Sequence, residues 1–222
     1  MHRTHQPLKL ETCTARGRGS GAELIIVEGD SAAGAVFNMR DRQRQAVLPM
    51  QGKPLNALRA TDTRALQFPL FRELVAALGV TPMNRDTGEI GDITNLQFDR
   101  VVLLFDPDAD GIHCGALMLM YFYRWLRPLL ESGAIIMVRP PLFLITASSF
   151  AEPIHAYTPD HARRITAELT EQGAAEIKQH HHRGLASIAP GLLATSCLNP
   201  ATRRADVMGV ADAVAAVAVF GG

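Results

Sequence analysis

Two acidic segments, each directly after a short apolar run, contain the residues of this chain best suited to chemistry. In the first segment, Glu28 directly follows the apolar run at residues 24–27. After the second run, at residues 101–105, come three aspartates: Asp106, Asp108 and Asp110. Short β-branched-rich runs bounded by turn residues are typical of buried parallel strands, whose carboxyl ends form the ligand-binding edge of an open α/β sheet. Carboxylates that converge there repel one another unless a hard cation binds them, so the pattern predicts a Mg²⁺ site, with Mn²⁺ or Ca²⁺ as alternatives.

The elements that must position these residues follow an α/β pattern. Strands are predicted at residues 24–27, 46–49, 101–105 and 134–138, and helices at about 30–44, 69–78 and 113–130. Asp30 or Ser31 is the expected cap of the first helix, and Pro49 predicts either an edge strand or the end of a strand. Alternating strands and helices indicate a parallel sheet flanked by helices. We expect a flexible lead-in over 1–22, a main domain over 23–150, a connecting segment over 151–182 and a small helical tail over 183–222.

Other interpretations of the motifs fit less well. An EF-hand loop that begins at Asp106 needs glutamate at its twelfth position, where the chain has Leu117. A phosphate-binding loop after Glu28 lacks the lysine and hydroxyl residue that follow its second glycine. The histidines at 180–182 are expected in a solvated loop rather than at a metal, and Tyr121 and Trp125 in the core rather than against bases.

Composition is that of an ordinary globular protein, with 47% hydrophobic and 20% charged residues and a net charge of zero. Basic residues are nevertheless concentrated over 40–64, which suits either a docked polyanion or a solvated face. Three cysteines without metal-ligand spacing predict no disulfide framework and a reducing compartment. No secretory signal opens the chain and the apolar stretch 211–220 is too short to span a bilayer, so we expect a cytoplasmic protein without membrane contact.

The two acidic motifs together resemble the TOPRIM domain of type IIA DNA topoisomerases, in the B subunit of bacterial gyrase or topoisomerase IV. Further segments are similar to that family: LPMQGKPLN at 48–56, DADGIH at 108–113, YFYR at 121–124, RPPLF at 139–143, RGL at 183–185 and LNPATRR at 198–204. The resemblance covers about residues 8–220. The chain departs from the family in three places. Gln51 and Gly115 stand where basic residues are common in the family. The segment at 183–187 lacks the family's second glycine and its glutamate, and the connecting segment over 151–182 is shorter.

The resemblance implies a Rossmann-like TOPRIM fold and the metal-dependent DNA cleavage and religation module of an ATP-hydrolysing type II topoisomerase, an isomerase. It implies that Glu28, Asp106 and Asp108 hold the catalytic ion, that Asp108 and Asp110 hold a second, and that Glu28 also moves a proton. Double-stranded DNA is the implied substrate, contacted by five residues: Lys53, His113, Arg40, Arg42 and Arg44. The nucleophilic tyrosine belongs to a partner A subunit. No ATP site is found in this sequence, so a separate ATPase and transducer chain is a further expected partner.

Two alternatives stay open at this point. The drifted motif positions are compatible with a non-catalytic, stand-alone TOPRIM protein that binds DNA or the A subunit. A stand-alone TOPRIM nuclease or primase-like enzyme is less compatible, because the segments after residue 183 resemble the topoisomerase.

Overall fold

The computed structural model describes residues 10–83, 91–150 and 152–221. Its main sheet has the strand order β2-β1-β3-β4-β8. The strands are β1 (Glu23–Glu28), β2 (Gln45–Met50), β3 (Arg100–Leu103), β4 (Ile135–Val138) and β8 (Ala205–Val207). The first four pair in parallel, which confirms the predicted parallel sheet and the edge position of β2. β8 pairs antiparallel to β4, so the tail contributes a strand to the sheet as well as helices.

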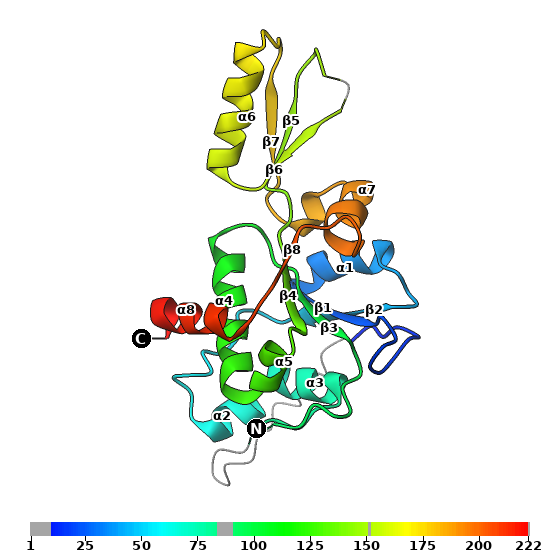
Figure 1. The fold of residues 1–222 in the computed structure, drawn as a ribbon, viewed down its shortest axis with the longest axis vertical. Helices are drawn as coiled ribbons and strands as arrows, with labels where there is room; N and C mark the ends of the chain where they lie inside the picture. The colour runs from blue at the N-terminus through cyan, green and yellow to red at the C-terminus, as the bar shows by residue number, and fades with distance from the viewer. Residues whose placement is uncertain (1–9, 84–90, 151, 222) are drawn as a thin grey trace, which may run out of the picture.

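Helices cover both faces of this sheet (Figure 1). On one face, Ile25 and Val27 pack with α1 (Gly29–Met39), α7 (Pro190–Leu193) and the π-helical turn Ala194–Leu198. On the other, Leu24 and Ile26 pack with residues of five helices: α2 (Asp62–Gln67), α3 (Pro69–Leu78), α4 (Ala109–Trp125), α5 (Arg127–Glu131) and α8 (Val210–Phe220). The alternation along β1 therefore buries its side chains from Glu23 to Val27, as expected of a parallel strand covered on both sides, and leaves Glu28 half-buried at its end.

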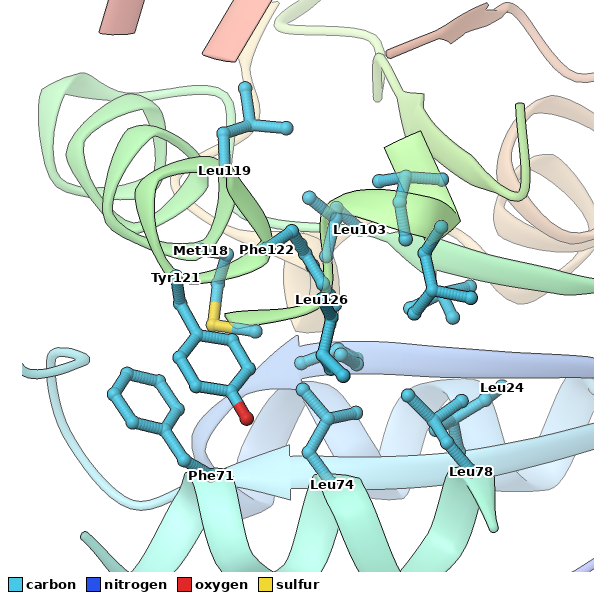
Figure 2. Packing of buried hydrophobic residues seen from close by; sticks show 14 of the residues in the cluster. Leu24, Phe71, Leu74, Leu78, Leu103, Met118, Leu119, Tyr121, Phe122 and Leu126 are labelled. Carbon is cyan, nitrogen blue, oxygen red and sulfur yellow. The ribbon is translucent and has the colours of Figure 1, made fainter. Parts of the chain in front are cut away.

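α4 forms the centre of the larger core. Figure 2 shows Tyr121 of α4 lying against Phe71 of α3, with ring centroids 3.8 Å apart. Tyr121 and Trp125 are both buried, which confirms that they are core residues. A Cβ at Gly115 would lie 2.9 Å from Met137 Cε, so a larger residue at this position would require the Met137 side chain to move. α4 is 17 residues long, and no helix in the described ranges is long and apolar enough to cross a membrane.

Two helices differ from their predicted boundaries. α1 ends at Met39 rather than near residue 44, because Arg40 is extended and a turn follows before β2. Its N-cap is Glu28, without a side-chain cap bond, so the predicted Asp30 or Ser31 cap is wrong. The predicted helix 113–130 begins at Ala109 and breaks at Leu126, because Pro128 in the first turn of α5 cannot donate a backbone hydrogen bond. Helix α3 has its predicted bounds and ends on Gly79 at φ 67°, and part of the turn-rich segment 81–92 lies outside the described residues.

A second, smaller sheet stands off the main one at the top of Figure 1. We call it, with its helix, the small subdomain: β5 (Phe143–Thr146), β6 (Ile154–Ala156), α6 (Pro159–Glu171) and β7 (Lys178–His181), in the sheet order β6-β5-β7. It has its own hydrophobic cluster, and its sheet includes residues on both sides of position 150. The solvated loop expected for 180–182 is wrong, since His180 and His181 pair with β5 and His182 is only 3% exposed. The division of the chain into four domains and segments stays a prediction.

Candidate metal centre

The carboxyl ends of β1 and β3 bring the two acidic segments together. These strands are adjacent and parallel, with Ile26 opposite Leu103, so the chain after each strand emerges at the same edge. Glu28 and Asp106 are half-buried there, and Asp108 and Asp110 are exposed. Burial is the main cause that raises the pKa of Glu28, and the charges of all three aspartates raise it further. The four predicted ligands thus share one electrostatic environment.

A tight loop joins β3 to α4 and sets the direction of the aspartates. Asp108 is the N-cap of α4, and its Oδ1 accepts a hydrogen bond from the Gly111 backbone N–H at 2.8 Å. A Cβ at Gly111 would lie 2.0 Å from the backbone oxygen of Asp106, a distance that no side chain tolerates. Position 111 therefore requires glycine, because the first turn of α4 packs directly against the backbone just after the end of β3.

Asp106 is held by a segment from far along the sequence. Its Oδ1 accepts a hydrogen bond from the Leu185 backbone N–H at 2.8 Å, and a Cβ at Gly184 would lie 3.0 Å from its Oδ2. Burial raises the pKa of Asp106, and the bond from Leu185 partly opposes that shift. Sequence reasoning did not identify this contact. The only signal was the RGL segment at 183–185, which resembles the family without revealing what it touches.

Lys53 supplies positive charge at the same edge. Its Nζ lies 2.6 Å from Asp110 Oδ1, and both side chains are largely exposed. The hydrogen bond lowers the pKa of Asp110 and raises the pKa of Lys53. His113, one turn into α4, is half-buried and stacks on Phe220 of α8 with a centroid distance of 5.3 Å. Lys53 thus lies within the acidic cluster, and His113 lies beside it.

Glu28 has an unexpected neighbour in Cys114. The buried Cys114 thiol hydrogen-bonds the Glu28 carboxylate, which lowers the Glu28 pKa against the larger effects of burial and like charge. Burial, with the Glu28 charge, raises the pKa of Cys114 to about 12. The cysteine is therefore a neutral neighbour of the glutamate.

The chemical type of these four side chains fits a hard divalent cation. All four side chains offer carboxylate oxygens, the ligands that Mg²⁺, Mn²⁺ and Ca²⁺ prefer, and two of them have raised pKa values that a cation would relieve. Within residues 10–83, 91–150 and 152–221, no three His, Cys, Asp or Glu side chains are already arranged to hold one ion. Each aspartate instead bonds an N–H or ammonium group of the protein. A cation bound here would exchange for some of these contacts.

Three predicted DNA contacts lie elsewhere. Arg40, Arg42 and Arg44 precede β2, at the amino-end edge of the sheet, whereas the acidic cluster lies at the carboxyl-end edge. The six residues of a strand separate these edges by roughly 20 Å. Arg40 and Arg42 lie over the Phe37 ring, at 4.8 and 5.5 Å from its centroid, and Arg44 lines an amino-end cleft of about 870 Å³. The structure does not bring these arginines to the metal centre.

Comparison with known proteins agrees with this geometry. The family model for the Toprim domain matches residues 23–140, which contain the main parallel sheet from β1 to β4 and all four carboxylates. The chain therefore belongs to the Toprim family. Its relatives include the B subunit of DNA gyrase from Thermotoga maritima, which is 34% identical over 220 residues, 99% of this chain and 33% of that protein.

Two further relatives show the same range of similarity. The B subunit of DNA gyrase from Archaeoglobus fulgidus is 34% identical over 200 residues, 90% of this chain and 30% of its own length. The B subunit of DNA topoisomerase 4 from Rickettsia bellii is 32% identical over 197 residues, 89% of this chain and 28% of its own length. The chain thus spans about a third of the curated relatives that it matches. These matches include both gyrase and topoisomerase IV subunits.

Proposed function

We propose that this chain is the metal-dependent DNA cleavage and religation module of a type II DNA topoisomerase, an ATP-dependent isomerase complex. The observation that carries the proposal is the convergence of Glu28 and the three aspartates at the adjoining ends of β1 and β3. The proposed partners are double-stranded DNA, an A subunit that carries the nucleophilic tyrosine, and a separate ATPase and transducer chain. The relatives with the matching segments, gyrase and topoisomerase IV B subunits, support this choice, and the proposed location is the cytoplasm.

The roles of the acidic side chains follow from their chemistry. Glu28, Asp106 and Asp108 are the proposed ligands of a catalytic Mg²⁺, with Mn²⁺ or Ca²⁺ as alternatives, and Asp108 and Asp110 of a second ion. When bound, such an ion stabilises negative charge on phosphate oxygens. Glu28 has a raised pKa, which suits a group that exchanges a proton with the 3′ oxygen of DNA during cleavage and religation.

The basic residues divide into two groups. Lys53 and His113 are the proposed contacts of the scissile phosphate, because both lie at the acidic cluster. Arg40, Arg42 and Arg44 are proposed to contact a different stretch of the duplex, since the length of a strand separates them from the cluster. Tyr121 is not a substitute for the partner's tyrosine, because burial raises its pKa and removes it from DNA.

The test is a cleavage assay with the A subunit, supercoiled plasmid and Mg²⁺, trapped with detergent and protease. Protein-linked nicked or linear DNA is expected, and Asp108→Asn should reduce it at least a hundredfold. Asparagine keeps the helix cap, so this variant removes charge without unfolding α4. Glu168→Gln, on the exposed side of α6, is the control that should cleave normally. Unchanged cleavage by Asp108→Asn would refute the proposal.

A second candidate is a non-catalytic Toprim module that binds DNA or the A subunit. It is favoured by one observation: each aspartate already bonds a protein N–H or ammonium group. A stable complex with the A subunit that never yields protein-linked DNA would select this candidate.

A further inference from the structure

A basic cleft lies where the small subdomain meets the main sheet. It encloses about 360 Å³ and is lined from the main sheet by Arg139 and Arg204 and from the subdomain by Tyr157, Asp160, His161 and Arg164. Figure 1 shows the base of α6 closest to the main sheet at this junction. None of these lining residues is among the predicted DNA contacts. The cleft therefore has no role in the function proposed above.

The cleft carries an excess of positive charge. Arg139 is paired with Asp206 at 2.5 Å, and Asp160 is paired with Arg163, which lies outside the cleft. The other two arginines of the lining, Arg164 and Arg204, make no ion pair within the described residues. The Arg204 guanidinium lies 5.0 Å from the centre of the Tyr157 ring, which fixes its plane without neutralising it. Two guanidinium charges thus remain available to an anion.

The first turn of α6 adds to this field. α6 is a 13-residue helix whose N-cap, Thr158, lines the cleft, and its first-turn residues Asp160 and His161 do as well. The amino end of a helix carries partial positive charge. Guanidinium groups bind oxyanions, phosphate and carboxylate alike, in a planar, bidentate manner. The combination suits an oxyanion such as a phosphate group.

The position of the cleft relates it to the metal centre. Arg139 follows β4 and Arg204 precedes the antiparallel β8, so both lie at the carboxyl-end edge, as Asp106 does after β3. Neighbouring strands are about 4.8 Å apart, so β8 is about 10 Å from β3 along this edge. That offset corresponds to about three steps of 3.4 Å along a DNA strand. One nucleic acid backbone could therefore reach both sites.

We propose that Arg164 and Arg204 bind a backbone phosphate of DNA in this cleft, a few nucleotides from the acidic cluster. The identity of the ligand as DNA rests on the proposed function; the capacity to bind an oxyanion such as phosphate rests on the cleft itself. A free phosphate compound is the other source of the same chemistry. The test below separates the two.

The experiment measures binding of a fluorescein-labelled 30-base-pair duplex to the whole chain by anisotropy, from 25 to 200 mM salt. The double variant Arg164→Gln/Arg204→Gln should weaken binding roughly tenfold or more at 50 mM salt. The slope of log affinity against log salt should become shallower by about one, because one phosphate contact is lost. Arg164→Lys/Arg204→Lys keeps the charges and should keep the slope. Arg72→Gln removes one exposed charge on α3 and should change neither quantity.

Three outcomes would overturn the proposal. Two are a salt slope unchanged in the glutamine variant and the absence of duplex binding by the wild type at 25 mM salt. The other is tight, saturable binding of inorganic phosphate in a calorimetric titration, lost in the same variant, which would assign the cleft to a free phosphate compound. Cleavage with the A subunit is measured separately. If cleavage fails but the salt slope still depends on the two arginines, the proposed cleavage function is refuted and the proposed phosphate contact is supported.

Discussion

Strand β1 begins and ends with a glutamate, and the two residues have opposite surroundings. Glu23, at the amino end, is 5% exposed and receives both Arg203 nitrogens, at 2.5 and 2.8 Å, and the Gln45 amide at 2.9 Å. Glu28, at the carboxyl end, faces three aspartates and has the Cys114 thiol as its donor. The same side chain is thus neutralised by the protein at one edge and left with excess negative charge at the other.

The difference shows how one strand serves two purposes. The Glu23–Arg203 pair joins two residues that are 180 positions apart and so attaches the tail to the amino-end edge of the sheet. The carboxyl-end edge instead keeps carboxylates together at a cost in repulsion, which is typical of sites that bind a cation. The comparison predicts that substitutions at the two edges affect different measurements.

The largest expected effect is on stability at the amino-end edge. Arg203→Met leaves Glu23 buried without its partner and should lower the free energy of unfolding by about 3–5 kcal/mol. Urea denaturation measures this change. Arg127→Met breaks the exposed pair with Glu131 and should cost less than about 1 kcal/mol. Equal costs for the two variants would show that Glu23 is not the structural glutamate that we describe.

At the carboxyl-end edge, Gly184→Ala should act on metal binding. The new Cβ meets the Asp106 carboxylate at 3.0 Å, so we expect Mn²⁺ affinity to change about 10–100-fold, as for other substitutions that disturb a ligand's support. Calorimetric titration of Mn²⁺ measures this. Gly191→Ala introduces a methyl group in the same tail with no atom within 4 Å and is the matched control. Identical affinities for the two variants would mean that the tail does not position Asp106.

The cap of α4 separates two roles of one aspartate. Asp108→Ala removes the hydrogen bond to Gly111 and should lower the free energy of unfolding by about 1 kcal/mol, whereas Asp108→Asn should leave it nearly unchanged. Both variants should lose metal binding. Thermal denaturation without metal checks the stability difference. A larger loss for Asp108→Asn than for Asp108→Ala would contradict the capping role.

The smallest expected effect is a pH-dependent one at Glu28. Its pKa is raised in the folded state, so the folded protein binds this proton more tightly than the unfolded chain does. The stabilisation is complete below the unfolded pKa and is lost as pH rises through the folded pKa. Without metal at pH 7.5, Glu28→Gln should therefore raise the melting temperature by a few degrees. The gain should disappear near pH 4, and Glu168→Gln should show no such gain.

Much of the sheet was predictable because its strands are local apolar runs. The runs at 24–27 and 101–105 and the aspartates that follow them determine the acidic edge, since parallel strands end together. The parts that sequence reasoning missed are contacts between distant segments. Leu185 on Asp106, Cys114 on Glu28 and the added strand β8 leave no periodic signal in the chain. The position of Arg40, Arg42 and Arg44 was also not predictable, because the concentration of basic residues in the sequence does not indicate at which edge of the sheet they lie.

The contact between Leu185 and Asp106 also has a consequence for protein synthesis. The two residues are 79 positions apart, and ribosomes add about 5–20 residues per second, so Asp106 waits roughly 4–16 s for its partner to be made. Before Leu185 is made, the nascent chain comes to contain β1 to β4 and all four carboxylates. The order of translation therefore delays the finished site until Leu185 has been made, and a ribosome stalled before that point would display a sheet whose Asp106 still lacks its backbone hydrogen bond.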